Sequence, residues 1–251
     1  MDEAEKAPFT AHLEELRKRL IICFIAVGIG FAASYGFKEK LFQILVQPLL
    51  WVMNPGDTLI FTGLPEAFFT YLKVAFLSGL MLAAPVIIYE FWMFVAPGLY
   101  DREKRLLLPI VFLSSLFFVG GSLFGYFIVF PWGFKFFLGF ANEHLRPLPS
   151  MKEYLGFSAK LLLAFGFVFE LPLVITFLAK LGLVSVDFLK KNRKYAILLF
   201  FAGAAILTPP DVVTQIMMAL PLMLLYEISI LGARIFGRKK VEPATDSPKG
   251  A

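Results

Sequence analysis

The chain has 251 residues, of which 59% are hydrophobic and 17% charged, with a mean hydropathy of +0.76 and a formal net charge of +5. This composition is too apolar for a soluble domain of such length and predicts an integral membrane protein. The apolar runs are long and unbroken, which predicts spanning helices rather than an outer-membrane barrel. The single cysteine, Cys23, excludes an internal disulfide.

Six apolar runs follow one another along the chain, and we expect each to be a transmembrane helix of an all-α bundle. They lie at about residues 20–37, 67–89, 106–130, 155–183, 195–207 and 212–231. We expect residues 1–237 to form one membrane domain and residues 238–251 a basic, disordered cytoplasmic tail. Residues 38–66 should form a cap on the outer surface, and residues 131–154 a second outer loop.

The fifth run is short. Thirteen residues at about 1.5 Å each reach about 20 Å, whereas the hydrocarbon layer is roughly 30 Å thick. Pro209 and Pro210 cannot continue a helix. We therefore expect short last spans, with local thinning of the bilayer or a water-filled dip on the outer side.

The basic residues of the loops predict the orientation. Sixteen lysines and arginines fall in the N-terminal tail, the loops after the second and fourth runs, and the C-terminal tail, against five in the other loops. Because basic loops stay in the cytoplasm, both termini should be cytoplasmic. The basic excess then lies at the inner membrane surface, against anionic lipids, and does not indicate a nucleic-acid partner.

Glu170, near the middle of the fourth run, is an acid at bilayer depth. Such a group should face protein or a wet cavity. One interpretation is a hydrogen bond between helices, helped by a backbone carbonyl that Pro172 leaves without a partner. The other is a polar group in a cavity where a passenger or partner helix rests.

The cytoplasmic ends mix acids and bases closely. Glu15 can pair with Arg19 and Glu14 with Lys18 by spacing alone, and such exposed pairs contribute little. The stretch 85–105 passes from aliphatic residues through an aromatic run to a charged cluster, with a helix break at Pro97 and Gly98. We expect an elbow there, with its aromatic part along the membrane interface.

Four motifs, in order and together spanning about residues 10 to 235, resemble the TatC family, the six-span, signal-recognising subunit of the twin-arginine protein translocase. They are His12–Leu20, Phe94–Tyr100 with Glu103, Phe169–Pro172 and Leu207–Asp211.

The resemblance implies that Glu15 and Glu103 recognise the paired arginines of signal peptides on folded cargo, and that Phe94 belongs to the same surface. Two guanidinium groups need two carboxylates that each accept a fork of hydrogen bonds. Glu90 falls at a position that varies in the family and often holds an amide, so no function is carried onto it.

The resemblance also implies a concave, glove-like bundle whose hollow Glu170 faces. Single-span partners of the TatA and TatB type would dock at the outer ends of the last two spans. The matching docking or assembly positions are Pro48, Thr208, Asp211 and Gln215. From the residues alone, Gln215 could bond to another helix or satisfy local backbone. The family implies several copies of the chain in the complex, export driven by the proton gradient, and a bacterial inner-membrane location.

The alternative function is a proton- or ion-coupled transporter of small solutes with Glu170 as relay. The sequence shows no inverted repeat, and its single intramembrane acid lacks the matching second acid that a proton relay would use. It has no GxxxxGK[ST] phosphate loop, no HExxH and no cysteine or histidine cluster. We therefore expect no enzyme activity, metal or cofactor.

Overall fold

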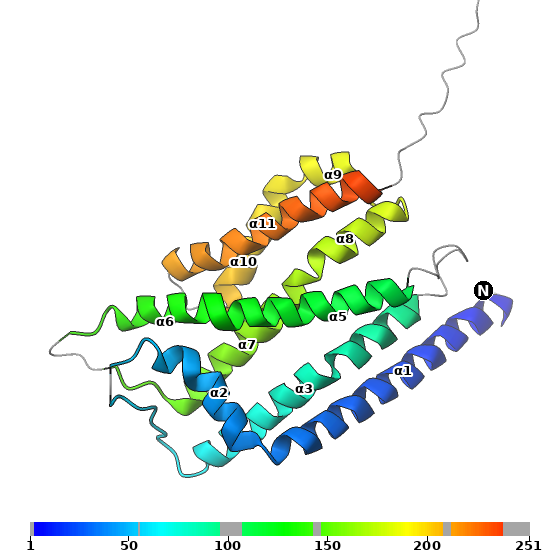
Figure 1. The fold of residues 1–251 in the computed structure, drawn as a ribbon. Coiled ribbons are helices and arrows are strands. Elements are labelled where there is room, and N and C mark those ends of the chain that lie inside the picture. Colours follow the sequence, from blue (N-terminus) through cyan, green and yellow to red (C-terminus); the bar gives the residue numbers. More distant parts are fainter. Residues whose placement is uncertain (1–2, 55, 96–106, 143–146, 208–211, 238–251) are drawn as a thin grey trace, which may run out of the picture.

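The structure is a computed structural model that describes residues 3–54, 56–95, 107–142, 147–207 and 212–237. It is all-α, as expected, and its long helices run side by side (Figure 1). Ile60 and Ser150 form an isolated β-bridge. The helices are α1 (Glu3–Tyr35), α2 (Lys38–Leu50), α3 (Glu66–Val95), α5 (Leu107–Phe124), α6 (Phe130–Leu138), α7 (Met151–Phe169), α8 (Leu171–Lys180), α9 (Val186–Lys191), α10 (Arg193–Leu207) and α11 (Val212–Phe236).

Four described helical segments are long and apolar enough to cross a membrane: residues 66–95, 107–138, 151–180 and 212–236. Thr10–Tyr35 and Lys38–Leu50 pass the same test together as a pair bent by 89°. Helix α10 has 15 residues and is shorter than these segments, in line with the expected short fifth run. The protein is a multi-pass membrane protein, and the count of six spans stays a prediction.

The segment after the first apolar run contains a helix, α2, that the sequence analysis did not predict. Its apolar side is buried through Leu45, Val46 and Leu49. They pack with Phe130 and Phe165 in the largest buried cluster, in the half of the bundle where α2, α6 and α7 meet (Figure 1). The expected outer cap therefore begins as a packed helix.

The third apolar run continues as helix past Pro131, where we expected an outer loop, and this expectation is wrong. A π-helical turn, Gly125–Val129, precedes the proline, and the Phe130 N–H donates to the Gly125 carbonyl. A proline in a regular helix removes one hydrogen bond and collides with the preceding turn. The wider turn changes the hydrogen-bond pattern just before the proline, and α6 extends to Leu138.

The stretch after Tyr89 also differs from the expectation. Helix α3 continues without interruption to Val95, so the aromatic run extends the spanning helix instead of bending away along the interface. The break expected at Pro97 and Gly98 lies outside the described residues. The fourth run is divided at Glu170, where α7 ends and α8 begins with Pro172 in its first turn.

Neighbouring helices pack in the order α1, α3, α5, α7, while α11 packs against α8 and α10. Helices α1 and α3 come close together at Gly30 and Gly79, where a Cβ added to Gly30 would lie 2.5 Å from the Gly79 carbonyl oxygen. Glycine at both positions lets the two backbones touch, as in membrane helix pairs with small residues at their interface. The two backbones are therefore in direct contact at this point.

Glu66, the first residue of α3, joins two segments that are far apart in the sequence. One carboxylate oxygen accepts hydrogen bonds from the Thr62 and Gly63 N–H groups at 2.8 and 3.2 Å. The other accepts from the Ser150 hydroxyl at 2.7 Å and the Lys152 N–H at 3.1 Å. The side chain therefore links the start of α7 to the segment before α3 through hydrogen bonds.

Glu66→Gln is expected to speed amide hydrogen exchange about tenfold at Gly63 or Lys152, because the single acceptor oxygen of the amide can serve only one of the two segments. Mass spectrometry of the purified protein in nanodiscs measures this rate. Glu153→Gln, at an exposed acid in the first turn of α7, is the control. Equal exchange in both variants would contradict the role given to Glu66.

Candidate functional site

The first half of α1 and the end of α3 lie side by side at one end of the bundle (Figure 1). They bring together Glu15 and Phe94, two of the three residues expected to recognise a signal peptide. The third, Glu103, lies outside the described residues, as do Thr208 and Asp211. The expected proximity of Glu103 to Glu15 therefore stays a prediction.

Arg19 connects the two helices by binding a carboxylate on each. Its Nε and Nη2 donate to Glu15 Oε1 at 3.1 and 2.6 Å, and its Nη1 donates to Glu90 Oε2 at 2.9 Å. The pairing of Glu15 with Arg19 is confirmed. The bond to Glu90 was missed, although an acid within an apolar and aromatic run is itself a signal of a special environment.

Phe94 also has a partner on α1. Its ring stacks on that of His12, with centroids 4.4 Å apart and an interplanar angle of 20°. His12 is exposed, as expected of a surface residue. Phe94 thus contacts α1 directly, and Glu15 is connected to α3 through Arg19.

Glu14, next to Glu15, has a different environment. It pairs with Lys18 at 3.0 Å, and its side chain is 65% exposed, whereas that of Glu15 is 31% exposed. The helix turns Glu15 toward α3 and leaves Glu14 facing away. The chemistry of this surface is therefore that of a partly buried carboxylate that accepts two N–H donors from one guanidinium group, beside an aromatic ring.

Glu170 lies where α7 meets α8, and its Oε1 is buried without a hydrogen-bond partner among the described residues. The Ser114 hydroxyl contacts the carboxyl group and accepts a hydrogen bond from Trp92 Nε1 at 3.0 Å. A well-satisfied bond between helices, one of the two interpretations of Glu170, does not account for Oε1. The contact with Ser114 of α5 fits a bond between helices, while Oε1 keeps spare hydrogen-bonding capacity inside the bundle, so both interpretations stay open.

Pro48 has a specific structural effect. It lies in the last turn of α2 and is fully buried. A proline at this position cannot donate to the Ile44 carbonyl one turn earlier. That carbonyl accepts instead from the hydroxyl of Tyr126, in the π-helical turn. The proline thereby creates the acceptor that ties α2 to the third apolar segment.

Gln215, one turn into α11, donates from Nε2 to the Phe201 carbonyl of α10 at 2.9 Å. Of the two alternatives left by the sequence, the bond to another helix is the one observed. The partner helix belongs to the same chain, and the bond holds the last two described helices together.

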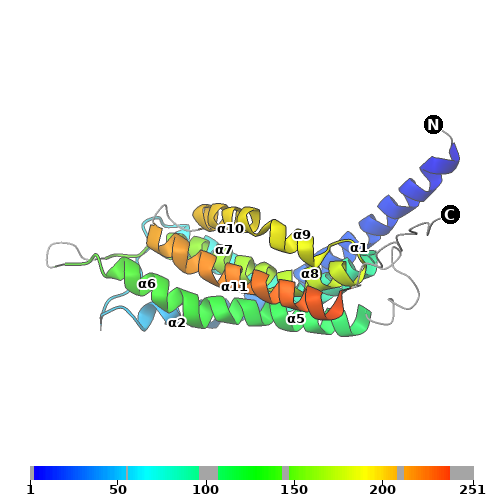
Figure 2. The same ribbon diagram turned by 90° about the horizontal axis from the view of Figure 1, so that it is seen from above.

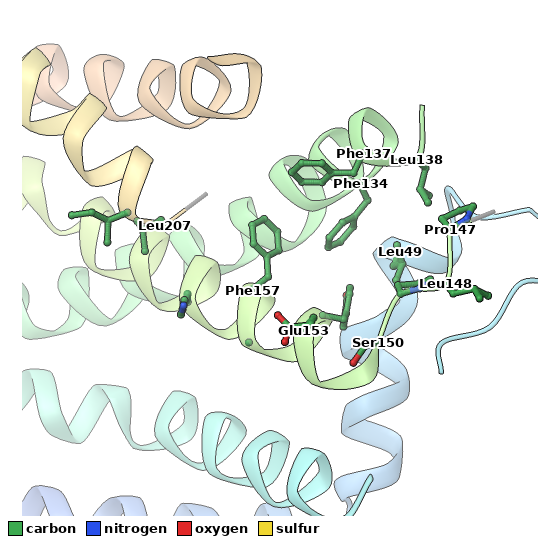
Figure 3. A pocket seen from close by; sticks show the side chains of 15 residues that line it. Leu49, Phe134, Phe137, Leu138, Pro147, Leu148, Ser150, Glu153, Phe157 and Leu207 are labelled. Carbon is green, nitrogen blue, oxygen red and sulfur yellow. The ribbon is translucent and has the colours of Figure 1, made fainter. Parts of the chain in front are cut away.

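A cavity of about 610 Å³ lies at the other end of the bundle from Glu15, among α2, α6, α7 and α10 (Figure 3). Phe134, Phe137 and Phe157 form its aromatic side, while Glu153 and Ser150 are polar residues on its wall. Leu49 and Leu207 also line it, next in sequence to Pro48 and Thr208. Within the described ranges, no group of three or more histidine, cysteine or acidic side chains is placed to hold a metal ion.

Comparisons with known proteins agree on one family. The family model described as Sec-independent protein translocase protein (TatC) matches residues 11–221. The chain is 70% identical to the TatC protein of Desulforapulum autotrophicum, over 95% of this chain and 88% of the relative. It is 38% identical to TatC of Escherichia coli K12, over 96% of this chain and 95% of the relative.

The same family appears among solved structures. A crystal structure described as the twin arginine translocase receptor TatC superposes with a TM-score of 0.82 at 43% identity, and covers 90% of this chain and 100% of its own. The residues that the family model matches include Glu15, Phe94, Glu170 and Gln215. The chain therefore belongs to the TatC family of Sec-independent protein translocase proteins.

Proposed function

We propose that this protein is the core receptor subunit of a twin-arginine translocase and binds the twin-arginine signal peptides of folded proteins. The observation that carries the proposal is the Glu15 carboxylate, which binds a guanidinium group through two N–H donors in the first half of α1. A signal arginine offers the same donors. Lysine offers a point charge without this fork geometry.

The signal peptide is recognised in two parts. Glu15 and Glu103 each receive one arginine, and the apolar segment of the signal packs on Phe94 before it enters the bundle toward Glu170. The parallel ring contact between Phe94 and His12 supports this assignment, because it shows an aromatic face that accepts a flat partner. The unsatisfied oxygen of Glu170 supports a polar contact deeper in the path.

The subunit lies in the bacterial inner membrane with both termini in the cytoplasm and crosses it six times. The excess of basic residues in the corresponding loops supports this orientation. The start of α1 and the end of α11 lie at the same end of the bundle, which agrees with an even number of crossings (Figure 2).

TatA- and TatB-type subunits dock along α10 and α11 at the outer side, through the positions of Thr208, Asp211 and Gln215, with Pro48 supporting assembly. Ala204 is the only residue of α10 that is buried in the described part of the chain, so this helix has a long free apolar surface for a single-span partner or lipid. Several copies of the chain assemble in the complex, and the proton gradient drives export.

The test is crosslinking of a signal peptide to a photoreactive residue at position 94 of the full-length protein in nanodiscs. We expect a twin-arginine peptide to label this position at least tenfold more strongly than a twin-lysine peptide, since lysine does not reproduce the fork. A photoreactive residue at the exposed Phe68, at the opposite end of α3, is the control and should label weakly with both. Equal labelling of position 94 by both peptides would overturn the proposed recognition.

A further inference from the structure

Arg19 is shared unequally between its two carboxylates. Glu15 accepts two of its hydrogen bonds and Glu90 accepts one. The side chain of Glu90 is only 10% exposed, against 31% for Glu15 and 19% for Arg19. Glu15 is therefore the carboxylate that a ligand reaches first, and Glu90 is the one furthest from water.

The charges of these three residues do not cancel. Two carboxylates around one guanidinium group leave these three residues with a net charge of about −1, so the group can accept a second cation. The guanidinium group is itself largely buried, and a buried charge that loses its partners is strongly disfavoured. A ligand that takes Glu15 away from Arg19 must leave the arginine another partner.

Glu90 meets that requirement. We propose that Glu90 is a positioning residue that keeps Arg19 in an ion pair when an arginine of the signal peptide takes the place of Arg19 at Glu15. This inference rests on the proposed function. In this exchange Glu15 keeps a guanidinium partner throughout, and Arg19 keeps an ion pair with α3. The cost of releasing Glu15 is thereby lowered without any change in the packing of the two helices.

The exchange also contributes to the selection of arginine over lysine. Glu15 Oε1 accepts from both Nε and Nη2 of Arg19, and a second guanidinium group replaces both bonds with the same planar geometry. A lysine ammonium group lacks the planar pair of donors. Arg19 thus acts as an internal competitor that a signal lysine displaces poorly.

The experiment measures peptide affinity of the full-length protein in nanodiscs with a twin-arginine and a twin-lysine peptide. Glu90→Gln should weaken binding of the twin-arginine peptide about tenfold, because Arg19 then depends on Glu15. Adding Arg19→Gln removes the competitor, so the double variant should return to within about threefold of the native affinity for the same peptide. Its preference for arginine over lysine should be smaller than that of the native protein.

A charge-matched control separates exchange from a general effect of net charge. Glu90→Gln with Lys18→Gln has the same net charge as the double variant but leaves Arg19 in place, and Lys18 is exposed and paired with Glu14. We expect this control to remain about tenfold weaker than the native protein. If it recovers as fully as the Arg19→Gln combination, net charge explains the result and the exchange is overturned.

The possible outcomes also distinguish the two proposals. Equal affinity of the native protein for both peptides would overturn the proposed function itself. Two results would overturn only the exchange, provided that the native protein prefers the twin-arginine peptide. One is an unchanged peptide affinity of the Glu90→Gln variant, and the other is a double variant whose affinity does not recover. The double variant has neither buried charge, so its own affinity tests the exchange even if Glu90→Gln alone does not fold. An affinity more than tenfold below the native value would then count against it.

Discussion

Glu15→Gln is expected to lower the affinity for a twin-arginine signal peptide about 10- to 100-fold. A hydrogen bond to a charged group contributes about 1.5–3 kcal/mol, and about 1.4 kcal/mol corresponds to a factor of ten in affinity. Glutamine keeps the shape of the side chain but removes the charge and one acceptor oxygen. Titration of a labelled peptide into the full-length protein in nanodiscs measures the change.

The neighbouring acid is the control for this prediction. Glu14→Gln makes the same chemical change one residue away, at a side chain that is 65% exposed and pairs with Lys18. An exposed pair contributes about 0–1 kcal/mol, so affinity should fall less than fivefold. Equal losses in the two variants would mean that only the net charge of α1 attracts the peptide, and that Glu15 has no special role.

Gly30→Val is expected to disturb the whole α1–α3 pair. A Cβ at this position would lie 2.5 Å from the Gly79 carbonyl oxygen, so the helices must separate to accommodate a larger side chain. Overpacking of this kind costs about 1–3 kcal/mol. Because Arg19 and His12 of α1 meet Glu90 and Phe94 of α3, separation should also weaken signal binding.

Steric trapping in nanodiscs or detergent measures the unfolding free energy, and Gly28→Val provides the matched control. Gly28 is on the same helix, and a Cβ there has nothing within 4 Å among the described residues. Both variants share the change in helix propensity, so their difference reports the helix contact alone. If Gly30→Val is as stable as Gly28→Val and binds peptide equally, the close contact does not control the site.

Several elements could be predicted from the chain because the membrane restricts its choices. In hydrocarbon, backbone groups must bond within the segment, so each long apolar run indicates a helix. The runs at 67–89 and 212–231 are confirmed as helices α3 and α11, although each helix extends beyond its run. The expectation at Pro131 was wrong because a proline usually ends a helix. Here a π-helical turn before the proline lets the helix continue, and that turn has no clear sequence signal.

The candidate site also contains some contacts that the sequence predicts and others that it does not. Glu15 and Arg19 are four residues apart on a helix, so local geometry already brings them together. Glu90 is far away in the sequence, and nothing in its local spacing identifies Arg19 as its partner. The Tyr126 bond to the carbonyl that Pro48 leaves free is equally a product of packing between distant segments.

The sequence by itself determined that this is a helical membrane protein, where its long apolar segments lie, and which acids belong to family motifs, because lipid selects apolar helices and motifs are local. Only the tertiary structure decided that Arg19 is divided between Glu15 and Glu90, and that Glu15 rather than Glu14 faces α3. Both follow from the packing of α1 against α3, whose backbones come close at Gly30 and Gly79. That packing joins segments far apart in the chain and cannot be read from either segment alone.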